Sequence, residues 1–376
     1  MPERAPIRVA MVLPPRGDFS PAAAGAIGIV VHGLARASGA GFAPVVLGPD
    51  SPFAPYADVA FAPVRPGWWP PGPLAWRYGL AVRRCLRRVA PGLIEVHNRP
   101  DVALLLAARC PGLPVVLFLH NDPLEMRAAR TVAARRRLLA RLARVVTVSA
   151  FLRGRLLEGL LGTGREAVLP NPIGGAAMPA PVAAEAREKV LLFAGRVVRD
   201  KGADEFVAAA AAALPRLPGW RAEMFGADRF GPDQPENAYL SALKGRAAAA
   251  GITMHGYRPH AEVLAAMARA AIVVVPSRWA EPFGMTALEA LAAGAALIAS
   301  PRGALPEVAG EAARYAEPDE PGALAASMVA LAEDPAARAA LGAAGLARAR
   351  EFDVGRVAAR LDRLRKEVLD QEGDRS

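Results

Sequence analysis

Short apolar runs rich in β-forming residues alternate with helix-forming stretches along almost the whole chain of 376 residues. In the first half the apolar runs are 7–13, 44–47, 93–97, 115–120 and 145–149, and the helical stretches include 26–37, 74–89 and 124–143. Such alternation is typical of parallel strands joined by helices that cover both faces of the sheet. The sequence therefore predicts an α/β fold.

A second series of the same kind follows a stretch rich in Pro, Gly and Ala at 170–184. Its apolar runs are 190–194, 222–225, 253–255, 272–276 and 296–300. A chain of this length is large enough for two domains that each bury a core. We expect two doubly wound, Rossmann-like domains, 1–180 and 181–351, and a helical tail at 335–370 that is interrupted near 351–353.

The composition is that of a globular protein, with 53% hydrophobic and 22% charged residues. Two cysteines are too few for a disulfide framework, which favours a reducing cytoplasm. The apolar run at 7–13 is followed by Pro14-Pro15-Arg16, which indicates a first strand and not a secretory signal. No apolar run approaches the ~20 residues that span a bilayer. We expect a cytoplasmic protein that is soluble or bound at the inner face of the membrane.

Positive charge is concentrated in the first half of the chain. Residues 1–172 hold 22 arginines, no lysine and 10 acidic residues, whereas 173–376 hold 24 basic and 26 acidic residues. The arginines cluster at Arg83, Arg84, Arg87, Arg88 and at Arg127, Arg130, Arg135, Arg136, Arg137, Arg141, Arg144. Such clusters would attract anionic surfaces, whether lipid headgroups, phosphorylated glycans or nucleic acid. The other interpretation is a solvated helix face in a chain that prefers Arg throughout.

The stretch 276–294 reads Pro-Ser-Arg-Trp-Ala-Glu-Pro-Phe-Gly-Met-Thr-Ala-Leu-Glu-Ala-Leu-Ala-Ala-Gly. Its two acids, Glu281 and Glu289, lie on a loop after a predicted strand and in the first turns of a predicted helix. The start of that helix offers unpaired N–H groups and a positive dipole end, which suit a phosphate. Carboxylates beside an anion need other partners, and sugar hydroxyls are suitable donors. This pattern indicates a nucleotide-sugar site.

The whole string, together with 292–300 and 303–307 that follow it, resembles the retaining glycosyltransferases of family 4, which have the two-domain GT-B fold. The resemblance implies that Glu281 contacts hydroxyls of the donor hexose and that Glu289 contacts the ribose hydroxyls. It further implies that the intervening segment lies near the hexose and phosphates; its residues are Pro282, Phe283, Gly284, Met285 and Thr286. A last helix at about 352–372 is expected to cross back and complete the N-terminal domain.

A second motif, Gly195-Arg196 to Lys201-Gly202, follows the first predicted strand of the second domain. A glycine turn there opens a crevice at the carboxyl end of the sheet, and two cations in it can bind a diphosphate. The motif resembles the family's Gly-Arg…Lys-Gly segment, which implies that Arg196 and Lys201 neutralise the leaving phosphate. The alternative is a solvated loop. At the ends of later strands, the resemblance makes Tyr257 and Arg258 candidates for the nucleobase site.

The first domain offers His97-Asn98 and His120-Asn121, each at the end of an apolar run. A metal site is a poor interpretation, because no further ligands stand at suitable spacing. The resemblance places His120 beside the donor sugar and His97, Asn98 and Asn121 toward the acceptor. For either histidine the alternative is a core residue with its hydrogen bonds satisfied.

The loop into the first predicted helix is a further candidate for the donor site. The family usually has two adjacent glycines there, so that the backbone can approach the pyrophosphate. Gly25 matches one of them, but Ala24 replaces the other. Donor binding through Gly25 is therefore an expectation that this departure weakens.

The resemblance implies metal-independent transfer of a hexosyl group, with retention, from a nucleotide sugar to a glycan or lipid-linked acceptor. No cofactor is expected beyond that donor, and nucleic acid is not a predicted partner. The basic first half favours an anionic acceptor in cell-envelope polysaccharide or lipopolysaccharide biosynthesis. Two alternatives stay open: a nucleotide-sugar epimerase, and a non-catalytic surface or coat-assembly protein on the same fold. No Gly-x-Gly-x-x-Gly or Walker loop supports a dinucleotide oxidoreductase or a P-loop enzyme.

Overall fold

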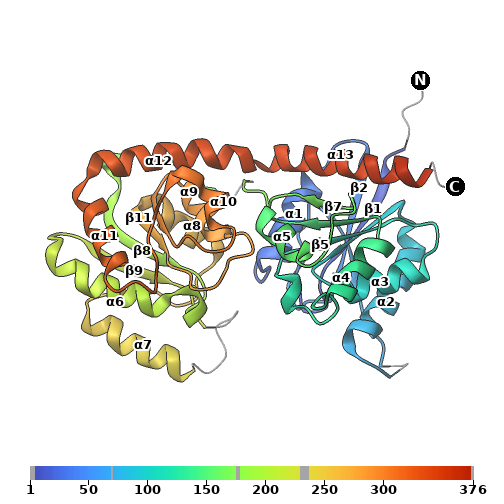
Figure 1. Cartoon of the computed structure of the whole chain (residues 1–376), viewed down its shortest axis with the longest axis horizontal. Coiled ribbons are helices and arrows are strands. Elements are labelled where there is room, and N and C mark those ends of the chain that lie inside the picture. The colour runs from blue at the N-terminus through green and yellow to red at the C-terminus, as the bar shows by residue number, and fades with distance from the viewer. Residues whose placement is uncertain (1–4, 69–70, 175–177, 229–236, 374–376) are drawn as a thin grey trace. The chain divides into compact units, whose positions relative to one another are not determined.

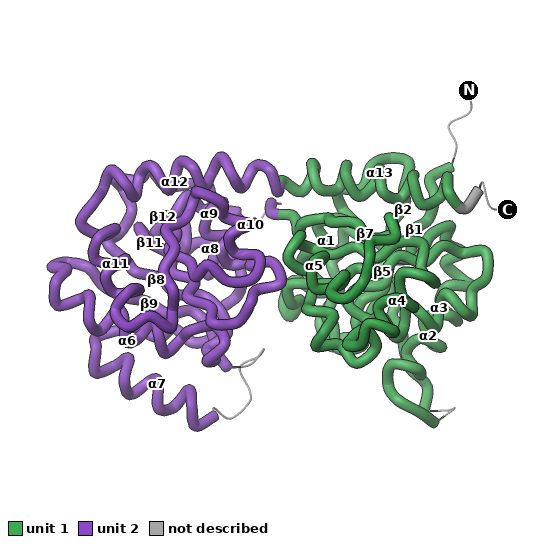
Figure 2. The backbone as a smooth tube through the Cα atoms, in the orientation of Figure 1, with its two compact units in different colours: residues 1–172, 353–376 green, residues 173–352 purple. Residues whose placement is uncertain are grey.

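The computed structural model describes residues 5–68, 71–174, 178–228 and 237–373 (Figure 1). The chain divides into two compact units, one made of residues 1–172 with 353–376 and the other of residues 173–352 (Figure 2). The sequence suggested a first boundary at 180, eight residues later than this division, and a second at 351. The tail is helical on both sides of a break at Arg350–Phe352, and its last helix belongs to unit 1.

Unit 1 is built on a seven-stranded parallel sheet in the order β3-β2-β1-β4-β5-β6-β7. Its strands are β1 (Ile7–Val12), β2 (Phe42–Pro49), β3 (Ala60–Val64), β4 (Leu93–His97), β5 (Val115–Leu119), β6 (Arg144–Thr147) and β7 (Glu166–Val168). Its helices are α1 (Ala26–Arg36), α2 (Leu74–Val89), α3 (Pro100–Arg109), α4 (Val132–Arg141), α5 (Ala150–Leu157) and α13 (Val354–Gly373). Every residue of β4 and β5 is buried, because helices cover both faces of the sheet.

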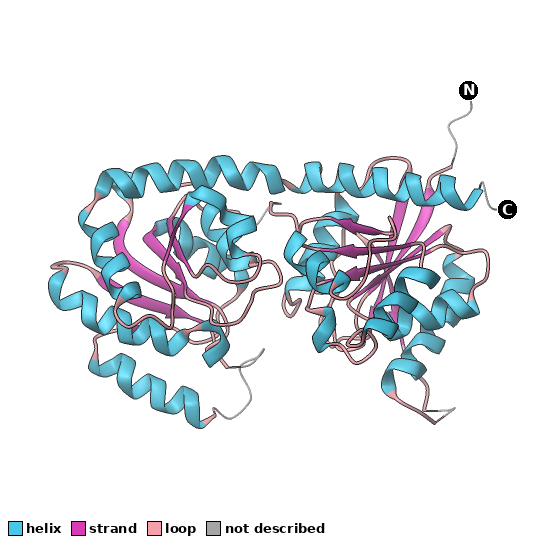
Figure 3. Ribbon diagram, in the orientation of Figure 1, coloured by secondary structure: helices cyan, strands magenta, loops and turns pink. Residues whose placement is uncertain are grey.

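Unit 2 repeats this plan with a six-stranded parallel sheet in the order β10-β9-β8-β11-β12-β13. Its strands are β8 (Glu188–Ala194), β9 (Arg221–Phe225), β10 (Thr253–Met254), β11 (Ala270–Val275), β12 (Ala296–Ala299) and β13 (Ala313–Tyr315). Its helices are α6 (Ala203–Ala213), α7 (Ala238–Ala249), α8 (His260–Arg269), α9 (Met285–Ala292), α10 (Leu305–Ala309), α11 (Ala323–Glu333) and α12 (Pro335–Ala349). Figure 3 shows helices against the strands in each unit.

The predicted pair of doubly wound sheets is confirmed. Helix α2 spans the predicted 74–89, but the helix predicted at 124–143 begins only at Val132. The chain first makes a short 3₁₀ turn at Pro123–Glu125, and the hydroxyl of Thr131 then caps α4 by accepting from the amide of Ala134 at 3.2 Å. A capping residue with extended backbone fixes where a helix starts, which explains the later beginning.

In each sheet the strand order reverses once, between β1 and β4 in unit 1 and between β8 and β11 in unit 2. At such a point the connections leave the sheet in opposite directions, and a crevice opens beyond the carboxyl ends of the two strands. Gly195 follows β8, and the stretch that begins at Pro276 follows β11. The two motifs of unit 2 therefore lie at its switch point.

Candidate functional site

The carboxyl ends of β8 and β9 approach closely through two glycines. Gly195 has φ 150° and Gly226 has φ 135°, and the amide of Gly226 donates to the carbonyl of Gly256 at 2.8 Å. A Cβ on Gly226 would lie 1.8 Å from the carbonyl oxygen of Gly195. Glycine is required there, and bare backbone lines this edge of the sheet.

Lys201 and Glu281 form an ion pair at the switch point, with Nζ and Oε1 2.6 Å apart. The hydroxyl of Ser277 donates to the same oxygen at 2.6 Å, and Lys201 also lies over the ring of Trp279, 5.2 Å from its centroid. Within the described residues, Oε2 of Glu281 has no hydrogen-bond partner. One carboxylate oxygen is thus held by the protein and the other remains available to a ligand.

Backbone contacts hold the loop of Lys201 against the loop of Glu281. The amides of Arg278 and Trp279 donate to the carbonyl of Asp200 at 2.9 and 3.1 Å. Gly202 has φ 68°, and a Cβ on it would lie 1.9 Å from the carbonyl oxygen of Pro276. The ion pair of Lys201 is therefore set by the approach of two main chains and not only by its own side chain.

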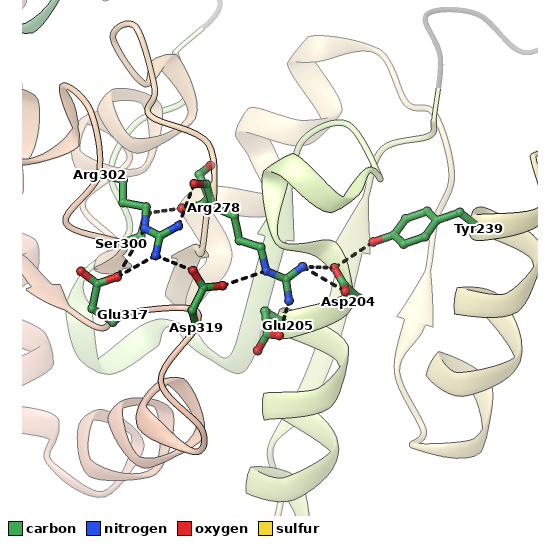
Figure 4. Close-up of polar contacts among 9 residues, drawn as sticks. Asp204, Glu205, Tyr239, Arg278, Ser300, Arg302, Glu317 and Asp319 are labelled. Atoms are coloured by element: carbon green, nitrogen blue, oxygen red, sulfur yellow. Dashed lines mark hydrogen bonds and ion pairs between the residues drawn. The ribbon is translucent and has the colours of Figure 1, made fainter.

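Arg278, three residues before Glu281, is held by several carboxylates (Figure 4). Its Nη1 donates to both carboxylate oxygens of Asp204 at 2.9 and 3.0 Å, its Nη2 donates to Glu205, and its Nε donates to Asp319 at 3.3 Å. Arg302 joins the network by donating to the carbonyl of Arg278 at 2.9 Å and to Asp319 at 2.5 Å. Several charges that share partners form a more rigid support than isolated surface pairs.

The segment after Glu281 leads into α9 through Gly284, which has φ 100°. Pro282, Phe283 and Gly284 are buried, whereas Met285 and Thr286 are half-buried. No side chain among the described residues caps the helix. Its first amides and the positive end of its dipole are therefore available to an anion, as the sequence predicted for a helix start at this position.

Glu289 lies one turn into α9 and is 8% exposed. Its Oε1 is 2.8 Å from Nε2 of His260, the first residue of α8. The hydrogen bond to Glu289 raises the pKa of His260, although burial acts in the opposite direction. Sequence reasoning missed His260, because nothing in its local pattern distinguishes it from an ordinary helix-start residue.

The remaining candidates of unit 2 are less constrained. Arg196 directly follows Gly195 and is half-buried, and its guanidinium pairs with no carboxylate in the described parts of the chain. Tyr257 is 40% exposed. Arg258 lies 4.0 Å from Glu262 in an exposed pair. Arg196 thus has no carboxylate partner among the described residues, and the side chains of Tyr257 and Arg258 lie on the surface beyond β10.

In unit 1 the two predicted histidines are neighbours. Nδ1 of His97 is 3.0 Å from Nε2 of His120, and His120 also bonds to the side chain of Asn171. Burial lowers the pKa of His120 to about 4, and burial together with the neighbouring His120 lowers the pKa of His97. Both rings are neutral at pH 7. A neutral pair in which His97 donates to His120 and His120 donates to Asn171 satisfies these contacts.

Asn98 organises the backbone around this pair. Its Oδ1 accepts from the amides of both His120 and Asn121 at 3.1 Å, and its φ of 58° is unusual for a residue other than glycine. Asn121 is exposed, whereas His97 is completely buried. His97 therefore reaches a ligand only through His120. A cavity of about 540 Å³ opens beside Asn98 and is also lined by Trp76, Arg99, Met126 and Arg127.

Gly25 is the N-cap of α1, as its predicted position in the loop before that helix requires. Nothing lies within 4 Å of a Cβ built on it, so packing does not demand glycine there. The close approach is at Gly28, where a Cβ would lie 2.4 Å from the carbonyl oxygen of Asp18. Tight packing of α1 thus depends on Gly28, which sequence reasoning did not single out.

One member of the predicted arginine clusters has another role. Arg135 is only 2% exposed, and its guanidinium donates to the carbonyls of Ala129, Arg130 and Leu156. The prediction that Arg135 belongs to a surface cluster was wrong, because its side chain is buried and its hydrogen-bond donors are used by backbone carbonyls. The arginines of α2 and α4 that are exposed are Arg84, Arg87, Arg88, Arg136, Arg137 and Arg141.

In the described part of the chain, no three His, Cys, Asp or Glu side chains are grouped so that they could hold a metal ion. No helix among the described residues has the length and apolar character needed to cross a membrane.

Two family models match the chain in succession. The model described as Glycosyltransferase Family 4 matches residues 27–173, and the model described as Glycosyl transferases group 1 matches residues 177–348. The glycogen synthase of Mycobacterium tuberculosis is 34% identical over 202 residues, which are 51% of this chain and 46% of that protein. The chain thus matches less than half the length of this relative.

Solved structures show the same fold over nearly the whole chain. Sucrose-phosphate synthase from Thermosynechococcus elongatus has a TM-score of 0.80 at 22% identity, covering 97% of this chain and 100% of that one. HepE of Anabaena, solved in complex with UDP, has a TM-score of 0.74 at 18% identity, covering 96% of this chain and 100% of that one. At these identities the likeness concerns the fold.

Proposed function

The chain belongs to the group 1, family 4 glycosyltransferases, and on this premise we propose that it moves a hexosyl group from a nucleoside-diphosphate sugar to a glycan or lipid-linked acceptor. The observation that carries the proposal is the Lys201–Glu281 pair at the switch point of unit 2, beside the uncapped start of α9. The cation and the helix amides suit the diphosphate of such a donor, and the free carboxylate oxygen suits a hydroxyl of its sugar.

Each group has a distinct role in the proposed reaction. Arg196, Lys201 and the first amides of α9 bind the diphosphate and stabilise the charge that develops when it leaves. The free oxygen of Glu281 accepts from hydroxyls of the hexose, and Glu289 accepts from the ribose. Loss of one contact to the developing charge typically costs about 3 kcal/mol of activation free energy.

We further propose that transfer proceeds with retention and without a metal ion. The leaving phosphate oxygen assists removal of the acceptor proton on the same face of the sugar, so no second carboxylate is needed as a nucleophile. Two cations, Arg196 and Lys201, supply the charge neutralisation that a metal ion would otherwise provide. His120 lies beside the sugar in this scheme, where a neutral ring can accept from a hydroxyl or donate to one.

The acceptor is proposed to bind to unit 1 and to be anionic, such as a cell-envelope glycan or the lipopolysaccharide core. The support is the arginine excess of residues 1–172 and the exposed arginines of α2 and α4. The cavity beside Asn98 offers Trp76 as an apolar wall and Arg127 as a cation. The same basic surface would hold the enzyme at the cytoplasmic face of an anionic membrane.

The most informative test is a thermal-shift panel of nucleoside diphosphates and their sugars, since selective stabilisation names the base and then the sugar.

Lys201→Ala and Glu281→Ala should each abolish transfer and leave the fold intact by circular dichroism. Full turnover by either variant refutes the assigned role. Product analysis without acceptor separates an epimerase, and the absence of any nucleotide-sugar binding in calorimetry favours a coat-assembly protein.

A further inference from the structure

The second carboxylate of the site is also held by the protein, through a residue outside the recognised motifs. Oε1 of Glu289 is 2.8 Å from Nε2 of His260, and Glu289 is 8% exposed. No partner binds Oε2 of Glu289 within the described residues. Glu281 has the same arrangement, with Lys201 and Ser277 on Oε1 and no partner on Oε2. Each carboxylate thus offers one free oxygen in a fixed direction.

A glutamate side chain has several rotatable bonds, and fixing it on binding costs conformational entropy. A partner already present in the free protein removes part of this cost, because the side chain is held before the ligand arrives. His260 can provide such a hold, since it projects from the start of α8 and α8 packs against α9.

We propose that His260 is a positioning residue for the donor nucleotide: it fixes Glu289 so that the free oxygen meets the ribose hydroxyls, and in its protonated form it offsets the carboxylate charge beside the diphosphate. This inference rests on the proposed function, in which Glu289 binds the ribose. His260 itself does not contact the reacting atoms.

Among the residues that the structure describes, Glu289 is the single counter-ion of His260. Glu289 is the only titratable residue of α9, and β11 has none. β8 carries Glu188 and Lys189, but Glu188 pairs in register with Ala270, at the opposite end of α8 from His260. In the segment that contains His260, the charged side chains of Arg258 and Glu262 lie 4.0 Å apart and pair with each other.

Proton binding should therefore be coupled to nucleotide binding. The pKa of His260 is raised by Glu289, so the imidazolium and its charge-assisted hydrogen bond are present below that pKa and are lost as pH rises through it. Donor affinity should fall in the same range. By reciprocity, binding of the nucleotide should be accompanied by uptake of a proton.

The test compares His260→Ala and His260→Gln with the wild type, using calorimetry with UDP, ADP and GDP and with the 2′,3′-dideoxy form of whichever binds. The matched control is His32→Gln. His32 forms a similar histidine–carboxylate pair, with Asp58 at 2.8 Å, but it lies in unit 1. Circular dichroism and melting temperature verify the fold, and His260→Gln serves if His260→Ala does not fold.

The ribonucleotide should bind His260→Ala about tenfold more weakly, as expected for a lost bond to a charged group. The dideoxy nucleotide should lose less than about twofold, and the decline of wild-type affinity with rising pH should flatten. His32→Gln should bind like the wild type. Equal losses for ribose and dideoxy nucleotides would show a merely structural role and overturn the inference, as would unchanged ribonucleotide binding with an unchanged pH profile.

Failure of the proposed function gives a different result. If the wild type binds no nucleoside diphosphate, both the function and the role of His260 are overturned. If it binds ribose and dideoxy forms equally, the contact of Glu289 with ribose is wrong, and the role of His260 is overturned with it. If the wild type binds the ribonucleotide more tightly than the dideoxy form, and His260→Ala shows the same difference, the proposed function stands and only the role of His260 is overturned.

Discussion

Arg365 should be the residue that fixes the last helix on unit 1. Arg365 and Glu95 are both completely buried, and Nε and Nη2 of the arginine donate to Oε1 and Oε2 of the glutamate at 2.7 and 2.9 Å. Nη1 donates to Ser38 at 2.8 Å and to Asp362 at 2.9 Å. One guanidinium thus joins α13 to the middle of β4, and the informative perturbation is Arg365→Met.

The cost follows from what the substitution leaves behind. Methionine fills much of the volume of the arginine stem, so the cavity is small, but the carboxylate of Glu95 loses the one counter-ion that it has in the described part of the chain. Breaking a buried pair from one side typically costs about 3–5 kcal/mol. For a unit of this size each kcal/mol lowers the melting temperature by about 2–4 °C, so unit 1 should melt about 6–20 °C lower.

The assay is thermal and urea unfolding of Arg365→Met, Glu95→Leu and the double variant, with hydrogen exchange of the α13 amides to locate the effect in unit 1. The double variant removes both charges and should recover most of the loss, with a coupling free energy on the order of 2–3 kcal/mol. The reasoning is refuted if the free energy of unfolding of Arg365→Met lies within about 1 kcal/mol of the wild-type value. It is also refuted if the double variant is no more stable than Arg365→Met.

Three further outcomes are expected. Gly226→Ala should destabilise unit 2 by about 2–5 kcal/mol in urea unfolding, whereas Gly245→Ala, in open space on α7, should be neutral or stabilising; equal effects would contradict the close approach. Burial alone would raise the pKa of Glu223, but hydrogen bonds from Arg269 and Arg221 hold it at about 2. Its stabilisation is therefore present above the unfolded pKa and lost as pH falls from about 5 to 2, and acid titrations of Glu223→Gln should lack this phase. Binding to anionic vesicles should weaken steeply with added salt, and binding that is insensitive to salt would argue against an electrostatic surface.

The fold was accessible from sequence where local and tertiary preferences agree. β4 and α2 were predicted to the residue, because β4 is a short buried segment in which Leu93, Ile94 and Val96 favour a strand, and α2 has a strong helical pattern. The short edge strands β3, β7 and β13 were missed. Edge strands are partly exposed and three to five residues long, so their pattern differs little from that of loops.

The site was predictable only where its residues are close together in the sequence. The loop of Glu281 and the Lys201 turn lie in compact motifs. The resemblance assigned both to one donor site, but it did not predict their contact at 2.6 Å, which joins residues 80 positions apart. His260 and Arg278 were missed for the same reason, since their partners come from other elements. Arg135 shows the reverse error, because a run of arginines does not reveal which member points inward.

The charged side chains of the candidate site in unit 2 are paired with each other in the free protein. In unit 2 the cation of Lys201 and the carboxylate of Glu281 neutralise each other before any ligand binds, as do His260 and Glu289 when the histidine is protonated. A diphosphate that entered would compete for Lys201 and leave Glu281 to the sugar hydroxyls, so binding would exchange internal partners and not bury new charge. Removing a carboxylate instead of a cation should therefore strengthen diphosphate binding while it weakens binding of the sugar. Glu281→Gln should accordingly bind the free nucleoside diphosphate at least as tightly as the wild type and the nucleotide sugar less tightly, and calorimetry showing equal losses for both would contradict this exchange.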